Sequence, residues 1–292
     1  MKRTVLIVLL VVVLGAVSVN AQSYVVGLSV STLNNPFFVD LKEGAEEAAA
    51  ELGLTLIATD AQNDANRQLS SVEDLISRGV DILIINPVDS SAIVPAIRTA
   101  NNAGIPVITV DRGADGGTVV SHVASDNVAG GRMAGEYIVE LLGGKGTVVE
   151  LEGIPGTSAA RDRGEGFNAA ISEYKDIQVV AKQEAGFDRA RGLSVMENIL
   201  QAQPEIDAVF AHNDEMALGA LTAIRVSGRD ILVVGFDATD DAVKAVEEGR
   251  MAATVAQKPR DMGRISVEVA LKYLEGESVD DYVPVELALV TK

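Results

Sequence analysis

The side chains most suited to chemistry lie just after the aliphatic segments of the chain, where strands are expected to end. They are amides, carboxylates, guanidinium groups and phenyl rings, whereas thiols are absent and only two imidazoles exist. Carboxylates and amides accept hydrogen bonds from hydroxyl groups, amides and guanidinium groups donate to them, and phenyl rings cover apolar C–H faces. Such a set suits a neutral polyhydroxylated ligand such as a sugar. The candidates are Asn35, Phe37, Phe38, Asn86, Asp111, Arg112, Arg161, Arg163, Phe187, Asn213, Asp237 and Gln257.

Each of these side chains also has an ordinary structural explanation. Asn and Asp at strand ends commonly cap helices and stabilise turns. For Asn86, Asn127 and Asp214 such a role explains the residue as well as ligand binding does. Arg161 and Arg163 could form a solvated helix face. Three further aromatic residues fall inside expected strands or a helix and are predicted to be core: Phe167, Phe210 and Phe236.

Catalytic and cofactor motifs are weak, so we expect neither an enzyme nor a bound cofactor or metal. The glycine-rich segment 143–147 precedes a strand and is predicted to be a turn, not a phosphate loop. The acidic segment 60–66 lacks the glycine and terminal glutamate of a calcium loop. Asp111 and Asp237 could form a glycosidase pair, but polar and cationic neighbours are expected to keep both ionised.

Charge and composition narrow the class of partner. The 292 residues carry a formal net charge of −18, which disfavours contact with phosphate backbones, so we expect no nucleic-acid binding. Hydrophobic residues make up 48% of the chain, enough to bury the cores of two domains.

The first 21 residues have the pattern of a signal peptide. Lys2 and Arg3 precede an aliphatic run from Val5 to Val17, and Val19-Asn20-Ala21 resembles a cleavage site. The run is shorter than the roughly 20 residues that span a bilayer, which disfavours the alternative of an uncleaved anchor. We therefore expect cleavage after Ala21 and an exported protein without stable membrane insertion, localised to the periplasm.

Beyond residue 22, short aliphatic segments alternate with helix-length amphipathic ones. This alternation predicts an α/β fold of parallel sheets, and the lack of polar alternation predicts strands buried on both faces. The expected strands are 24–30, 55–60, 82–86, 107–110, 120–124, 147–152, 177–184, 208–211, 231–236, 254–257 and 285–290. The expected helices are 37–52, 66–78, 90–103, 127–142, 158–172, 189–201, 215–226 and 260–274.

So many strands favour two sheets, and hence two Rossmann-like lobes joined by a hinge of three crossings. The crossings are expected near 124–127, near 257–259 and at the last strand. The N-terminal lobe would comprise residues 22–125 plus 258–286, and the C-terminal lobe residues 126–257 plus 287–292.

Several long segments resemble the type I periplasmic sugar-binding proteins, and within that family its ribose-binding members. They are Ser31–Phe38, Ile85–Pro87, Val110–Arg112, Ser121–Asn127, Gly156–Phe167, Phe210–Ala220, Val233–Asp237 and Ala253–Gln257, in the same order over essentially the whole chain after residue 21. The resemblance implies that a sugar is held between the lobes. It implies hydrogen bonds from Asn35, Asn86, Asp111, Arg112, Arg163, Asn213, Asp237 and Gln257, with Phe37, Phe38 and Phe187 stacking on the sugar.

The resemblance further implies a monomer that closes on D-ribose and delivers it to the permease of an ABC importer, and that could also contact a chemoreceptor. Another monosaccharide, such as allose, galactose or a furanose, remains an alternative. So do a repressor of the lac-repressor family and a secreted enzyme. His212 stands where the family pattern has Gln, and we expect its side chain to point away from the site.

Overall fold

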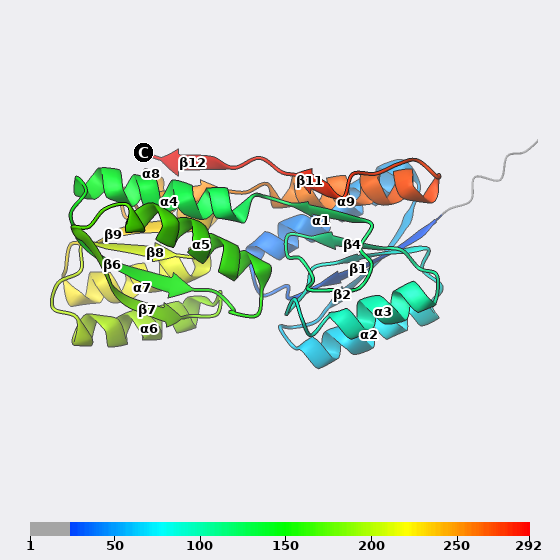
Figure 1. Ribbon diagram of the computed structural model, residues 1–292, viewed down its shortest axis with the longest axis horizontal. Helices are drawn as coiled ribbons and strands as arrows, with labels where there is room; N and C mark the ends of the chain where they lie inside the picture. Colours follow the sequence, from blue (N-terminus) through cyan, green and yellow to red (C-terminus); the bar gives the residue numbers. More distant parts are fainter. Residues whose placement is uncertain (1–23) are drawn as a thin grey trace, which may run out of the picture.

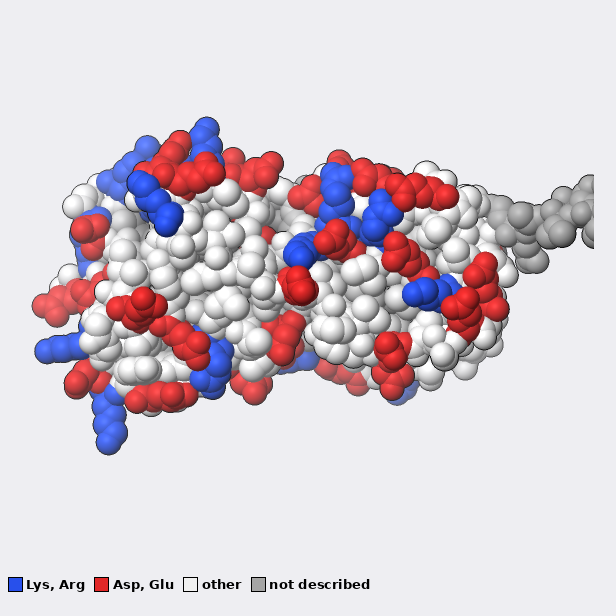
Figure 2. Space-filling model, turned by 90° about the horizontal axis from the view of Figure 1, so that it is seen from above, with Lys and Arg blue, Asp and Glu red and all other residues white. Residues whose placement is uncertain are grey.

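The computed structural model describes residues 24–292, so the expected signal peptide lies outside the described residues. Two α/β lobes lie side by side, and the segment with strands β11 and β12 runs along the upper edge of the view from one lobe to the other (Figure 1). Seen from above, the body is elongated, and acidic side chains are spread over both lobes with basic ones beside many of them (Figure 2). Among residues 24–292, no helix is both long and apolar enough to cross a membrane.

The first lobe is built on a six-stranded parallel sheet of order β11-β5-β4-β3-β1-β2. Its central strands are continuous aliphatic runs because helices cover both faces. Every residue of β3 is fully buried. The strands are β1 (Val25–Val30), β2 (Thr55–Asp60), β3 (Ile82–Ile85), β4 (Val107–Val110), β5 (Ser121–Ala124) and β11 (Tyr282–Pro284). The helices are α1 (Pro36–Leu52), α2 (Ala65–Ser77), α3 (Val94–Asn102) and α9 (Pro259–Leu274).

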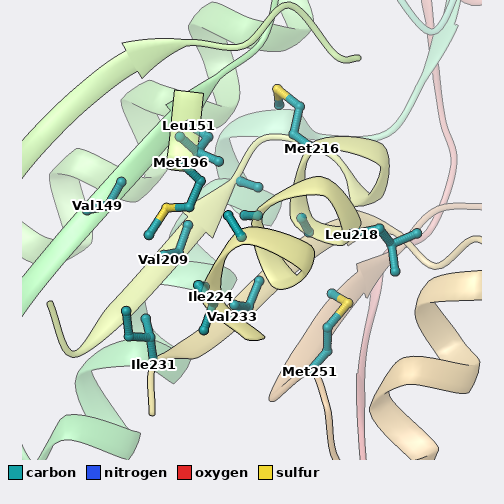
Figure 3. Packing of buried hydrophobic residues seen from close by; sticks show 14 of the residues in the cluster. Val149, Leu151, Met196, Val209, Met216, Leu218, Ile224, Ile231, Val233 and Met251 are labelled. Atoms are coloured by element: carbon teal, nitrogen blue, oxygen red, sulfur yellow. The ribbon is translucent and has the colours of Figure 1, made fainter. Parts of the chain in front are cut away.

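The second lobe repeats this plan with a sheet of order β12-β10-β9-β8-β6-β7, in which only β12 is antiparallel to its neighbour. A cluster around Val149, Met196 and Val233 fills the space between this sheet and helices α6 to α8 (Figure 3). The strands are β6 (Gly146–Glu152), β7 (Ile177–Glu184), β8 (Ala208–Ala211), β9 (Leu232–Asp237), β10 (Ala253–Ala256) and β12 (Ala288–Thr291). The helices are α4 (Asn127–Leu142), α5 (Ser158–Ser172), α6 (Arg189–Ala202), α7 (Asp214–Ser227) and α8 (Asp240–Glu247).

Three pairs of helices, α1 with α9, α4 with α5 and α6 with α7, are in close contact through glycines. In the α4–α5 pair, a Cβ at Gly131 would overlap the carbonyl of Arg163, and a Cβ at Gly166 would overlap the carbonyl of Val128. Glycine is therefore required at these positions because backbone meets backbone there. The contact fixes the position of α5, which carries Arg163.

The chain passes between the two sheets three times: from β5 to α4, from β10 to α9 and from β11 to β12. The expectation of two Rossmann-like lobes with three crossings is confirmed. The expected single strand 285–290 was wrong. The structure instead has β11 in the first sheet and β12 in the second, with the crossing between them.

Two other expectations about helices were wrong. Helix α8 was not predicted, because its pattern extends over only eight residues. The expected helix 90–103 begins only at Val94, because residues 90–93 form turns held by Asp89, whose Oδ1 accepts hydrogen bonds from the backbone of Ser91 and Ala92.

Candidate functional site

A cavity of about 240 Å³ lies between the lobes, at the carboxyl ends of the strands. Ligands of open parallel sheets bind at these ends. It is lined by Asn35, Phe37, Phe38, Asp111, Arg112, Ala159, Arg163, Phe187, Asn213 and Asp237. Nine of the eleven side chains expected to bind sugar therefore meet at one place. The other two, Asn86 and Gln257, each donate a hydrogen bond to a carboxylate of the lining.

The start of helix α1 forms one wall of the cavity. Asn35 caps this helix, its Oδ1 accepting from the backbone of Phe37 at 3.0 Å. Pro36 fits the first turn because its fixed φ is helical and its missing N–H is not needed there. The cap thus places Phe37 and Phe38 against the cavity. Their two rings pack edge to face with each other, with ring centres 5.1 Å apart.

The first lobe contributes a buried ion pair at the end of β4. Asp111 has a φ of 60°, an unusual backbone conformation for a non-glycine residue, and is oriented by a hydrogen bond from Asn86 Nδ2 to Asp111 Oδ2 at 3.1 Å. Arg112 donates to the carbonyl of Pro87 at 3.2 Å. Burial lowers the pKa of Arg112 to about 10, and the charge of Asp111 opposes this shift. Asp111 Oδ1 and Arg112 Nε are buried and have no hydrogen-bond partner within the protein.

Helix α5 contributes Arg163, which is almost completely buried. Its Nε donates to Asn127 Oδ1 at 2.7 Å, and one terminal nitrogen donates to the carbonyl of His212 at 2.6 Å. The same nitrogen lies 3.5 Å from Asp237 Oδ1, and the guanidinium lies 3.9 Å over the ring of Phe236. Arg163 is therefore held on several sides. Arg161 is half exposed and instead pairs with Asp115 of the first lobe at 3.0 Å.

Asp237 ends β9 in an unusual backbone conformation, with a φ of 121°. Gln257 Nε2 donates to its Oδ1 at 2.9 Å, and Gln257 Oε1 is buried without a partner. Burial raises the pKa of Asp237 well above its usual range, although the charge of Arg163 opposes this. Burial therefore has a larger effect on the pKa of Asp237 than the polar and cationic neighbours that were expected to keep this group ionised.

Phe187 and Asn213 complete the second wall. Asn213 caps α7, its Oδ1 accepting from the backbone of Met216 at 3.0 Å. Phe187 has a φ of 60°, and its ring occupies the space that a side chain at Gly153 would fill. The guanidinium of Arg112 lies 5.2 Å from the Phe187 ring centre and 5.0 Å from that of Phe38, so it contacts aromatic rings of both lobes.

Residues 26–278 match the family model described as the periplasmic binding protein domain. The chain belongs to the periplasmic binding protein family. The ribose import binding protein of Escherichia coli (strain K12) is 52% identical over 100% of this chain and 99% of its own. The ribose import binding protein of Bacillus subtilis (strain 168) is 54% identical over 94% of this chain and 89% of its own.

A solved structure supports the same family and fold. The periplasmic solute binding protein of an ABC transporter from Actinobacillus succinogenes 130z, with bound D-allose, has a TM-score of 0.87 and 34% identity. The alignment covers 92% of this chain and 98% of that one. Homologues of this chain are thus ribose import binding proteins, and its fold is that of periplasmic solute-binding proteins.

Several of the ordinary structural explanations also proved right in this family member. Phe167, Phe210 and Phe236 are fully buried core residues. Asn127 opens α4 and accepts from Arg163, so it supports the cavity without lining it. Ala159, which lines the cavity, was missed because an alanine has no polar group to attract notice.

A buried pair under the second wall explains the position of His212. Its Nε2 lies 2.9 Å from Glu150 Oε1, and the backbone N–H of Gly153 lies 3.4 Å from its Nδ1. This network makes Nε2 the donor to Glu150. Burial lowers the pKa of His212, which Glu150 opposes. Burial alone would raise the pKa of Glu150, but bonds from His212 and Asn168 and the charge of Lys182 hold it below its usual range. The His212 side chain is thus neutral and points away from the cavity, towards Glu150, while the His212 backbone carbonyl accepts the hydrogen bond from Arg163.

Asp214, next to Asn213, gives a pH-dependent prediction. It is fully buried and accepts from Thr254 Oγ1 at 2.7 Å and from the backbone of Thr239 at 2.8 Å. Burial raises its pKa to about 7, although these hydrogen bonds oppose the shift. Because the folded-state pKa exceeds the unfolded value of about 3.9, the folded protein binds this proton more tightly. Protonation of Asp214 should therefore increase the free energy of unfolding as the pH falls from about 7 towards 4. This contribution should disappear as the pH rises through 7.

The Asp214→Asn variant should lack this contribution. Its amide can still donate to Thr254 Oγ1 and accept from Thr239, so we expect it to fold. Relative to the wild type it should gain free energy of unfolding between pH 5 and pH 8, by up to about 3 kcal/mol. Urea unfolding at both pH values measures the difference, and an identical pH dependence in the two proteins would contradict the assignment.

Proposed function

We propose that this protein captures D-ribose in the cavity between its lobes and delivers it to an ABC-type importer. Five buried side-chain polar atoms of residues 24–292 have no hydrogen-bond partner within the protein, and two of them are Ser31 Oγ and Ser125 Oγ. The observation that carries the proposal is that the other three belong to residues predicted to bind the sugar: Asp111 Oδ1, Arg112 Nε and Gln257 Oε1. Buried polar groups are almost always paired, so these atoms call for a ligand. They offer two acceptors and one donor, which match hydroxyl groups that both donate and accept.

The aromatic residues support a sugar ring as the ligand. Phe37 and Phe38 come from the first lobe and Phe187 from the second, and all three line the cavity. Rings contributed by two lobes can cover both apolar faces of a flat pyranose when the lobes close on it. We infer that each of the eleven predicted residues serves ligand binding, with Asn86 and Gln257 also orienting Asp111 and Asp237.

The sugar would be captured because residues of both lobes line the cavity. A sugar that contacts both lobes completes its hydrogen bonds only when they close, so it favours the closed form. We assign residues 22–125 and 258–286 to one lobe and 126–257 and 287–292 to the other. The closed lobes would then be recognised by the importer, and the same closed monomer could contact a chemoreceptor as a second partner.

The proposal includes export and excludes catalysis. The segment 1–21 would direct the chain to the periplasm and be removed after Ala21. We infer that Asp237 is a hydrogen-bonding partner of a sugar hydroxyl, with its Oδ1 held by Gln257 Nε2 at 2.9 Å and by Arg163 at 3.5 Å.

A thermal-shift panel distinguishes D-ribose from the alternative monosaccharides. D-Allopyranose is ribopyranose with an added hydroxymethyl group, so a cavity that closes around ribose should disfavour it. At a hundredfold excess over its Kd, ribose should stabilise the protein by about 2.7 kcal/mol, or roughly 5–10 °C. Allose, galactose and arabinose should give smaller shifts at equal concentration. A larger shift with one of these sugars would replace ribose as the ligand.

A further inference from the structure

A second set of contacts joins the lobes beside the cavity without using any residue that lines it. Ser90 follows β3 in the first lobe, whereas Gly156 and Ser158 lie at the start of α5 in the second. The backbone N–H of Ser90 donates to the carbonyl of Gly156 at 2.9 Å. In return, the backbone N–H of Ser158 donates to Ser90 Oγ at 3.1 Å. These two bonds run in opposite directions across the cleft and fix the register of the two segments.

A third hydrogen bond and a buried setting strengthen the contact. The backbone N–H of Gly113 donates to Ser158 Oγ at 2.8 Å. The Ser90 carbonyl accepts from Asp115 N at 2.8 Å, which ties the two loops of the first lobe together. Ser90 is completely buried. Because water cannot replace these partners while the lobes are closed, breaking one bond leaves a buried group unpaired.

Gly156 permits this close approach. A Cβ at position 156 would overlap Asp89 Oδ2 of the other lobe. Asp89 cannot easily turn away, because its Oδ1 accepts from the backbone N–H groups of Ser91 at 2.9 Å and Ala92 at 2.7 Å. Gly156 does not have a left-handed backbone, so alanine is compatible with its local conformation. Glycine is required there only when the lobes are closed.

We propose that Ser90, Gly156 and Ser158 form a latch that stabilises the closed form independently of the sugar. The proposal rests on the proposed function, because it assigns these positioning residues to the closure that accompanies sugar binding. The apparent Kd equals the intrinsic Kd divided by the fraction of protein in the binding-competent form. A weaker latch should therefore raise the Kd of every sugar by the same factor, whereas a residue that touches sugar changes the preference between sugars.

The Gly156→Ala variant tests the latch. We expect the Kd of D-ribose and of a weaker ligand such as D-allose to rise by one common factor of roughly tenfold or more. Ser158→Ala, which removes one hydrogen bond, should raise both by roughly two- to tenfold. Gly116→Ala is the matched control: it lies in the facing loop, and its Cβ would meet only Val94 of its own lobe at 3.4 Å. Unchanged Kd values in Gly156→Ala, or a change for one sugar only, would overturn the proposal.

An interlobe distance measurement separates the latch from the proposed function. The sequence has no cysteine, so Arg98→Cys on α3 and Asn198→Cys on α6 would carry the only two spin labels. Without sugar, Gly156→Ala should reduce the closed population relative to Gly116→Ala, with both variants unfolding at wild-type temperature. Identical distance distributions would refute the latch whether or not any sugar binds. A wild type that binds no sugar would instead refute the proposed function.

Discussion

Arg163→Ala should raise the Kd for D-ribose by roughly 30- to 1,000-fold, a loss of about 2–4 kcal/mol. The guanidinium lines the cavity and is held by Asn127, the carbonyl of His212 and Asp237. Its removal deletes a charged donor to the sugar and leaves buried acceptors unpaired. Isothermal titration at a temperature well below unfolding measures the loss.

Two further variants make this result specific. Arg163→Lys keeps the charge but not the planar fork, so it should restore only part of the affinity. Arg132→Ala removes a surface arginine of α4 that pairs with Glu136 and Glu173, and it should leave the Kd unchanged. Wild-type affinity in Arg163→Ala would reject the assignment of this residue to the site.

Gly131→Ala should destabilise the second lobe and also weaken sugar binding. The new Cβ would overlap the carbonyl of Arg163, so α4 and α5 must separate. The energetic cost of such overpacking should exceed the gain of about 1 kcal/mol that alanine brings in helix propensity. We therefore expect the free energy of unfolding to fall by roughly 2 kcal/mol. Because α5 carries Arg163, its displacement should raise the Kd by roughly tenfold in the protein that remains folded.

Gly27→Ala is the control for this prediction. Its Cβ would lie 2.8 Å from Leu83 Cδ2 in the core of the first lobe, near the start of β1 and away from the strand ends that form the cavity. It should also destabilise the protein, with little change in Kd. Thermal unfolding and titration of both variants decide the point, and equal losses of affinity would contradict a specific role for the α4–α5 contact.

Much of the fold was predictable because its signals are local. The run Ile82-Leu83-Ile84-Ile85 is β-branched or aliphatic throughout, and Asn86-Pro87 ends it. Glycines with positive φ follow several helices, as at Gly53 and Gly143. The division of the last strand into β11 and β12 was not predictable, because it depends on which sheet each half joins and not on any local pattern.

The candidate site was largely predictable for a related reason. Strand order brings the carboxyl ends of parallel strands to one edge, so polar residues such as Asn86, Asp111 and Asp237 converge there whatever the details of packing. The raised pKa of Asp237, the bond between Glu150 and His212 and the latch at Ser90 were beyond sequence reasoning. Each depends on burial or on distances between segments far apart in the chain.

Isothermal titration of the chain from Gln22 onward with D-ribose tests the central claim most directly. The account predicts saturable binding of one sugar per protein with a Kd in the micromolar range or tighter. Sugar hydroxyl groups would then supply the hydrogen-bond partners that Asp111 Oδ1, Arg112 Nε and Gln257 Oε1 lack within the protein. The absence of heat and of any thermal shift at millimolar ribose would contradict the claim that this cavity binds D-ribose.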